Sequence, residues 1–238
     1  MVSKSVLRLS GELHIGHRLR QKYVLSTLRK LSLSDKRILD AGCGSGDYSL
    51  KLAEHFPTAS IDAIDISIKD TAFKKSLQNL KFFQEDLTDF VSPSTYDLIY
   101  TVDVLEHIEE DSKVLSNFYA SLKPNGLLLV HVPLIPQNFI PHRFLIHRFS
   151  ITSADDHVRE GYTTKELIEK LQIAGFHIQK TVNTFGWFGS LGWSLMKLLE
   201  TSRLRYRLLL HPLNLLLMEI DYWLPKRRGE GILVLAQK

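Results

Sequence analysis

A single α/β domain with a Rossmann-like, mostly parallel sheet is the fold that this sequence predicts. Short apolar runs alternate with helical patterns from residue 37 onward, and a glycine-rich turn follows the first run. The length of 238 residues suits one such domain, since domains usually have roughly 100–200 residues. The composition, 44% hydrophobic and 24% charged, excludes a collagen, a disordered chain and a polytopic membrane protein.

Seven strands are predicted, with helices on both faces of the sheet and a helical insertion between the last two strands. The first five alternate with helices and are therefore expected to be parallel. The predicted strands are Arg37–Ala41, Ser60–Asp65, Leu80–Gln84, Tyr96–Thr101, Gly126–Val132, Phe176–Val182 and Ile232–Ala236.

Helix signals separate these strands. Acidic residues 109–111 suit the start of a helix, and the Lys-Pro-Asn-Gly sequence at 123–126 stops it. Thr163 and Glu166 have the spacing of a capping box, and Gly175 closes the helix that follows.

The N-terminal segment, residues 1–36, is basic. Residues 1–37 hold nine Lys and Arg against Glu12 and Asp35, so the rest of the chain is slightly negative. Leu19 and Tyr23 recur at helical spacing between these charges, which favours a solvated helix face; attraction to an anionic surface is the alternative. The start of the chain lacks the apolar core of a secretory signal, and the single cysteine, Cys43, fits a reducing compartment, so we expect a cytoplasmic protein.

A glycine-rich turn between the first strand and a helix near Asp47 is the strongest local signal. It reads Asp40-Ala41-Gly42-Cys43-Gly44-Ser45-Gly46. The spacing G-x-G-x-G differs from the G-x-G-x-x-G of dinucleotide enzymes, whose last glycine lets a pyrophosphate approach the helix. A carboxylate at Asp40 would repel a pyrophosphate but could orient a cationic sulfonium ligand.

Two further acids complete a predicted adenosine site. Asp65 ends the second strand, where a carboxylate can accept hydrogen bonds from both ribose hydroxyls. Asp86 and Leu87 follow the third strand, where the carboxylate could accept from an adenine amino group and the Leu87 N–H could reach a ring nitrogen.

In this order, the motifs resemble those of class I S-adenosylmethionine-dependent methyltransferases. The resemblance also rests on Tyr96-Asp97-Leu98-Ile99 and Leu122-Lys123-Pro124-Asn125-Gly126, and it covers roughly residues 35 to 182 plus the last strand. It implies the strand order 3-2-1-4-5-7-6 with an antiparallel seventh strand, and S-adenosyl-L-methionine as the cofactor. The cofactor-binding residues it implies are Asp40, Gly42, Gly44, Gly46, Asp65, Ile66, Asp86, Leu87 and Val102.

The catalytic candidates come from two weaker likenesses. Asp103-Val104-Leu105-Glu106-His107 resembles the E-x-x-E-H segment of ubiquinone-pathway O-methyltransferases and small-RNA 3′-terminal methyltransferases, in which acids and His can hold a divalent metal. Asp103 replaces the first Glu, so we expect no metal here. His157-Val158-Arg159 and Tyr162 are similar to a bacterial H-V-R-x-Y-T segment with one extra residue, which places them at the rim of an acceptor pocket. His107, His157 and Tyr162 are the predicted catalytic residues.

The apolar segment 183–230 is the part of the chain that differs most from the resembled family. It contains Trp187, Trp193 and Trp223 with basic neighbours, but neither of its two apolar runs reaches the roughly 20 residues that span a bilayer. Three interpretations stay open: an interfacial membrane contact, a lid over the active site and a dimer contact. The first two favour a lipophilic acceptor.

The predicted function is methyl transfer from S-adenosylmethionine to an oxygen, nitrogen or carbon atom of a small acceptor. A pseudoenzyme or scaffold that only binds the cofactor is one alternative. Nucleic-acid methylation is another, but the sequence lacks an aromatic and basic recognition module, so no nucleic-acid partner is expected.

Overall fold

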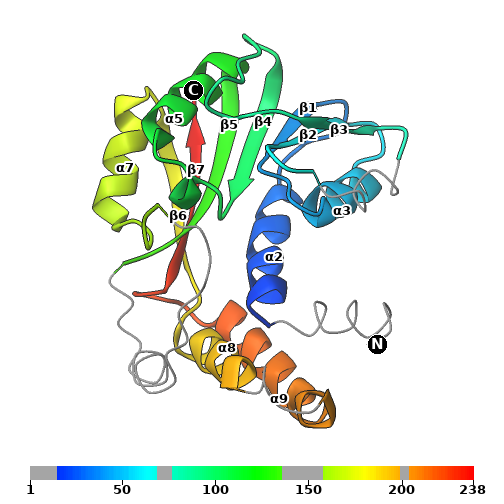
Figure 1. Cartoon of the computed structure of the whole chain (residues 1–238), viewed down its shortest axis with the longest axis vertical. Coiled ribbons are helices and arrows are strands. Elements are labelled where there is room, and N and C mark those ends of the chain that lie inside the picture. The colour runs from blue at the N-terminus through cyan, green and yellow to red at the C-terminus, as the bar shows by residue number, and fades with distance from the viewer. Residues whose placement is uncertain (1–14, 69–76, 136–157, 199–203) are drawn as a thin grey trace. The chain divides into compact units, whose positions relative to one another are not determined.

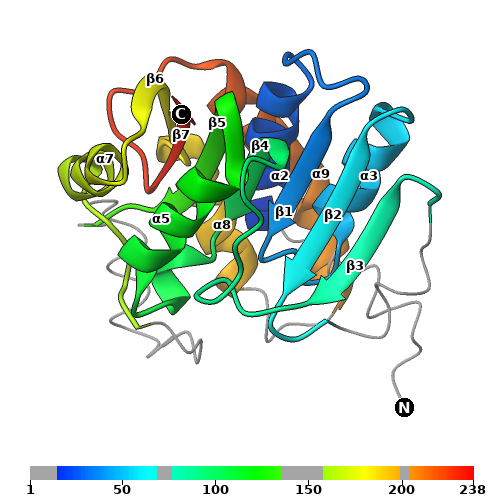
Figure 2. The same cartoon turned by 90° about the horizontal axis from the view of Figure 1, so that it is seen from above.

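The protein contains a seven-stranded sheet in a computed structural model, which describes residues 15–68, 77–135, 158–198 and 204–238. The strand order is β3-β2-β1-β4-β5-β7-β6, which confirms the predicted order (Figures 1 and 2). The strands are β1 (Arg37–Ala41), β2 (Ser60–Asp65), β3 (Leu80–Gln84), β4 (Tyr96–Val102), β5 (Leu122–Pro133), β6 (His177–Thr184) and β7 (Gly231–Gln237). The helices are α2 (Ile15–Leu28), α3 (Asp47–His55), η1 (Leu105–His107), α5 (Asp111–Ser121), α7 (Thr164–Ile173), α8 (Trp187–Leu198) and α9 (Leu204–Trp223).

The first five strands are parallel to one another, as the alternation with helices predicts. Strand β7 runs antiparallel to both of its neighbours, β5 and β6. The Lys238 N–H donates to the Gly126 carbonyl over 3.0 Å, so the end of β7 lies beside the start of β5. On the other side of β7, the Gln179 amide near the start of β6 donates to the Gln237 side chain near the end of β7 over 2.6 Å.

Strand β5 begins at Leu122, whereas the sequence predicts a start at Gly126. Leu122 pairs with Tyr96, and the register then shifts before Leu98 pairs with Leu127. The Lys-Pro-Asn-Gly sequence therefore stops the helix as predicted but forms an irregularity inside the strand, with Asn125 at a positive φ of 63°.

Helices cover both faces of the sheet. Helix α3 lies on one face, and α5 and α7 lie on the other (Figure 2). Helix α7 starts as the capping box predicts, because the Thr163 side chain accepts a hydrogen bond from the Glu166 N–H over 3.1 Å. The core between α5, α7 and the sheet is apolar, and its largest fully buried members include Phe118, Tyr162 and Phe176.

The chain divides into two compact units. Unit 1 comprises residues 1–24, 135–155 and 183–231, and unit 2 comprises residues 25–134, 156–182 and 232–238. Residues 15–24 of α2 thus share a unit with α8 and α9. Unit 2 contains β1 to β5 and most of β6 and β7.

The helices of unit 1 are joined by the buried carboxylate of Asp221 on α9. It accepts hydrogen bonds from the Gly189 N–H over 2.9 Å and from the Tyr23 hydroxyl over 3.2 Å. The ammonium of Lys226 pairs with the same carboxylate over 3.6 Å. These contacts bring together α2, α8 and α9. Because α8 and α9 lie between β6 and β7, the predicted helical insertion is confirmed.

In the described part of the chain, no helix combines the length and apolarity needed to cross a bilayer.

Candidate active site

The glycine turn lies at the carboxyl end of β1, beside the end of β2. Gly42, Gly44 and Gly46 all have positive φ angles, of 84°, 52° and 73°, so the turn uses conformations that favour glycine. The N–H groups of Gly42 and Cys43 both donate to the Ile64 carbonyl, over 2.8 and 2.9 Å. This pairing fixes the turn against β2 and leaves its outer side for a ligand.

The positions of Gly42 and Gly44 differ in their surroundings. A Cβ atom on Gly42 would lie 2.7 Å from Cγ1 of Val104, on the segment that follows β4. A Cβ atom on Gly44 would have no other atom within 4 Å. Gly42 therefore permits close packing of the turn against the β4 end, whereas Gly44 leaves open space where a cofactor could approach the backbone.

Asp65 connects this turn to the next strand. Its carboxylate accepts the Gly44 N–H over 2.8 Å and the Ser67 N–H over 2.9 Å, and the residue is partly exposed at the end of β2. Each carboxylate oxygen can accept a second hydrogen bond, so both remain suited to ribose hydroxyls. Its neighbour Ile66 is 65% exposed, which suits a contact with the flat face of a ligand.

Asp40 lies beneath the turn and is buried. Its carboxylate accepts hydrogen bonds from Ser49 on α3 and from the Tyr100 hydroxyl on β4, the latter over 2.7 Å. Burial raises the pKa of Asp40 to about 6, although both hydrogen bonds act to lower it. This arrangement favours a supporting role, in which Asp40 holds α3 and β4 under the turn, over the predicted direct contact with a cofactor.

The predicted adenine-binding pair follows β3. The Oδ1 atom of Asp86 accepts both the N–H and the hydroxyl of Thr88 over 2.8 Å, and these hydrogen bonds lower the pKa of Asp86. Asp86 therefore stays ionised at neutral pH, and its second oxygen is the atom suited to an adenine amino group. The Leu87 side chain is buried, so only its backbone could contribute.

A buried histidine and an acid meet at the carboxyl ends of β4 and β5. Val102, the last residue of β4, pairs with His131 of β5. The Asp103 N–H donates to the His131 carbonyl over 2.9 Å, and its Oδ1 atom lies 2.6 Å from His131 Nδ1. Asp103 has a positive φ of 53°, an uncommon conformation that is often associated with functional sites.

This Asp103–His131 pair was not among the sequence-predicted catalytic residues. In the sequence, His131 looks like any other residue of its strand. Only the pairing of β4 with β5 brings it next to Asp103. An imidazole held at Nδ1 by a carboxylate has its other nitrogen, Nε2, as the site that exchanges a proton. The signal that could have indicated it is a histidine near the carboxyl end of a predicted parallel strand, where α/β sheets bind ligands.

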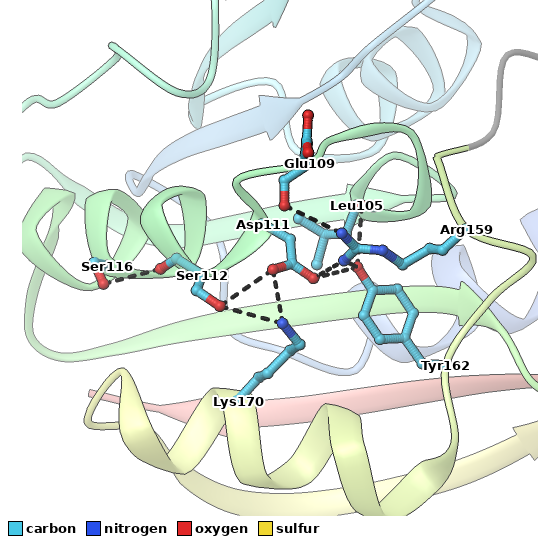
Figure 3. A network of polar contacts seen from close by, with 8 residues as sticks. All are labelled: Leu105, Glu109, Asp111, Ser112, Ser116, Arg159, Tyr162 and Lys170. Carbon is cyan, nitrogen blue, oxygen red and sulfur yellow. Dashed lines mark hydrogen bonds and ion pairs between the residues drawn. The ribbon is translucent and has the colours of Figure 1, made fainter.

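The three predicted catalytic residues are not brought together by the described residues. His107 is exposed on η1, and His157 lies outside the described part of the chain. Tyr162 is fully buried, and its hydroxyl donates to Asp111 over 2.7 Å, with the Leu105 carbonyl as a second possible acceptor at 3.0 Å (Figure 3). Burial, followed by the hydrogen bond to Asp111, raises the pKa of Tyr162 well above the usual tyrosine value, so we interpret it as structural.

Asp111 is the centre of this network in Figure 3. Its carboxylate pairs with the Arg159 guanidinium and with the Lys170 ammonium, the latter over 2.8 Å. Arg159 also donates to the Glu109 carbonyl over 3.1 Å. The network thus connects α7 and the segment before it to the start of α5, to the start of η1 and to the residues between η1 and α5.

Metal coordination has no support among the residues that the structure describes. No group of three or more His, Cys, Asp or Glu side chains is placed to hold an ion there. The Asp103-to-His107 segment does not gather its acids and histidine, because Asp103 pairs with His131 while His107 is exposed.

Comparison with known proteins agrees with this geometry. A family model described as a methyltransferase domain matches residues 15–181. A malonyl-acyl carrier protein O-methyltransferase of Halalkalibacterium halodurans is 33% identical over 138 residues, which are 53% of this chain and 51% of that protein. A ubiquinone biosynthesis O-methyltransferase of Rickettsia felis is 30% identical over 128 residues, 50% of this chain and 52% of that protein. The chain thus spans about half the length of these curated relatives.

Solved structures share the fold. Magnesium protoporphyrin IX methyltransferase of Synechocystis, solved with bound SAH, superposes with a TM-score of 0.62 at 18% identity and covers 100% of this chain and 89% of its own. An S-adenosylmethionine-dependent methyltransferase of Mesorhizobium loti gives a TM-score of 0.61 at 17% identity, with 92% and 98% covered. At these identities, the likeness concerns the fold.

Proposed function

Because the chain belongs to the S-adenosylmethionine-dependent methyltransferases, as the methyltransferase-domain match over residues 15–181 shows, we propose that it methylates an oxygen, nitrogen or carbon atom of a small, lipophilic acceptor. The observation that carries the cofactor part is the glycine turn held by Asp65, with open space at Gly44. The lipophilic acceptor is supported by the apolar helices α8 and α9. Such an acceptor would reside in or near a bilayer, so we place the enzyme at the inner face of the membrane.

The residues at the carboxyl edge fit the cofactor. The turn has glycines where a ligand must approach the backbone, and Asp65 can accept from two ribose hydroxyls. Asp40 and Asp65 place carboxylates close to the turn, where they would repel the pyrophosphate of a dinucleotide. S-adenosylmethionine has no phosphate, so these carboxylates are compatible with it. When bound, S-adenosylmethionine supplies an electrophilic methyl group on its sulfonium.

The task of the protein is then to align the acceptor, exclude water and remove a proton where the acceptor loses one. The Asp103–His131 pair lies next to the turn, since Val104 follows Asp103 and packs against Gly42. We assign the proton acceptor to His131 and its orientation to Asp103, in place of the predicted His107, His157 and Tyr162.

Cofactor choice tests the function directly. S-adenosylhomocysteine should raise the melting temperature of the protein, and NAD should not. At 100 times its dissociation constant, a ligand stabilises the native state by about 2.7 kcal/mol. The Asp65→Ala variant should bind S-adenosylhomocysteine more weakly by about 1–3 kcal/mol, because the ribose hydroxyls lose a charged partner. A shift with NAD and none with S-adenosylhomocysteine would rule out the proposed activity.

Removal of the proposed base should separate chemistry from cofactor binding. With tritiated S-adenosylmethionine and a total lipid extract as acceptor, we expect His131→Gln to lower label transfer by roughly 10²–10⁴-fold. The melting-temperature shift with S-adenosylhomocysteine should stay unchanged. Asp103→Asn should also lower transfer, because its amide no longer favours the same orientation and charge of the imidazole. Full transfer by His131→Gln would show that the pair is structural.

A further inference from the structure

The outer face of helix α9 is apolar and exposed. Leu213, Leu216 and Trp223 follow one another at helical spacing, with exposed fractions of 43%, 56% and 75%, and Leu224 next to them is also exposed. The opposite face of the same helix, which includes Leu217, Met218 and Asp221, is buried. A helix on the surface of a protein normally has polar residues on its solvent side. Helix α9 therefore has a second apolar face that the core does not use.

Aromatic residues gather at one end of this face. The Trp223 ring packs edge-on against Tyr222, with 5.2 Å between the ring centroids. At the start of α8, Trp187 is 57% exposed, and Gly186 and Gly189 on either side of it donate to Asp221 near the end of α9. The first turn of α8 and the last turns of α9 are therefore adjacent.

Positive charge is concentrated in the same unit. Unit 1 contains 14 Lys and Arg against six Asp and Glu, whereas unit 2 contains 16 against 20. The net charges are therefore +8 and −4, which together give the +4 of the whole chain. Arg227 and Arg228, a few residues after Trp223, are exposed. The apolar face therefore belongs to a unit that attracts anions.

We propose that the outer face of α9, with Trp187, Arg227 and Arg228, binds the surface of an anionic lipid bilayer. Exposed Trp and Leu beside Arg are the residues with which interfacial helices enter the headgroup region, and no described helix is suited to cross the bilayer. A nucleic acid would engage the Arg residues but leave the Leu side chains in water. A second copy of this face would bring two net charges of +8 together, which opposes self-association. The inference concerns binding only and does not depend on the methyl acceptor.

Vesicle co-sedimentation of the full chain tests the proposal. The wild type should bind vesicles of phosphatidylglycerol and phosphatidylcholine, bind pure phosphatidylcholine vesicles more weakly, and lose affinity as salt is added. The Leu216→Ser/Trp223→Ser variant should bind the anionic vesicles at least tenfold more weakly. The Arg227→Glu/Arg228→Glu variant should lose roughly 25-fold or more, at about fivefold for each basic residue removed from the surface.

A matched control is available on unit 2. Ile173 on α7 is 86% exposed, so Ile173→Ser removes an exposed apolar side chain outside the proposed face and should leave vesicle binding unchanged. The melting-temperature shift with S-adenosylhomocysteine serves as the folding check for each variant. If S-adenosylhomocysteine did not shift the melting temperature of the wild type, that result would contradict the proposed function and not the membrane contact, because vesicle binding does not need the cofactor.

Three results would overturn the membrane contact. The first is a wild type that does not bind anionic vesicles. The second is binding that the α9 variant and the Arg variant both retain, since another surface would then be responsible. The third is a wild-type dimer that Leu216→Ser/Trp223→Ser converts to a monomer, which would make the face a subunit interface.

Discussion

Asp111→Ala is expected to lower the free energy of unfolding by about 3–5 kcal/mol, because it leaves two cations without their shared buried partner. The Asp111 carboxylate pairs with Arg159 and Lys170 and accepts the Tyr162 hydroxyl. Removing it leaves the Tyr162 hydroxyl in the core with one hydrogen bond fewer. Urea denaturation followed by circular dichroism measures the loss.

Asp89→Ala is the matched control. Asp89 also pairs with a lysine, Lys113, over 3.3 Å, but its side chain is 81% exposed. An exposed ion pair contributes about 0–1 kcal/mol, so the control should unfold close to the wild type. If the two variants lost equal stability, the buried network would have no special part in holding the fold.

The same network gives stability a pH dependence of known sign. Burial alone would raise the pKa of Asp111, but hydrogen bonds from Lys170 and Tyr162 and the charges of Lys170 and Arg159 outweigh it, so the pKa is lowered. A lowered pKa means that the carboxylate stabilises the fold above its unfolded pKa of about 4. This contribution is lost as the pH falls through the folded pKa, and Asp111→Ala should remove it.

Gly42→Ala and Gly44→Ala are expected to fail in different ways. Gly42→Ala places a methyl group against the Val104 side chain and forces alanine to a φ of 84°, so we expect a stability loss of about 2–5 kcal/mol from overpacking and strain. Gly44→Ala meets no neighbouring atom. It should cost only about 1–2 kcal/mol of strain. It should also abolish the melting-temperature shift with S-adenosylhomocysteine, because its methyl group would occupy the space that we propose for the cofactor.

The double variant Gly42→Ala/Val104→Ala checks the cause. It removes both Val104 methyl groups that the new Cβ would contact, so part of the lost stability should return, while the backbone strain remains. Thermal unfolding of the three variants, with and without S-adenosylhomocysteine, separates packing from cofactor binding. A Gly44→Ala protein that binds the cofactor as the wild type does would remove Gly44 from the site.

The sequence by itself determined the strands and helix ends that are set by turn or capping residues next to them in the chain. Strands β1, β2 and β3 have the predicted bounds, because a turn or a helix signal stands at each end of these short apolar runs. The capping box at Thr163 also forms as predicted, since its hydrogen bond joins residues only three apart. The order of the motifs was enough to indicate the family and the sheet order, because both follow from the succession of strands and turns.

Only the tertiary structure decided which polar side chains meet. Asp40, a predicted cofactor-binding residue, accepts hydrogen bonds from Ser49 and Tyr100, which the sequence did not indicate as its partners. His131 contacts Asp103, which is 28 positions away in the sequence. Asp111 forms ion pairs with Arg159, in the segment before α7, and with Lys170 on α7. Such contacts depend on which strands are neighbours and on which side of the sheet each side chain points. The pattern along the chain indicates on which face of a strand or helix a residue lies. Which residue packs opposite it is decided by the packing of the whole domain.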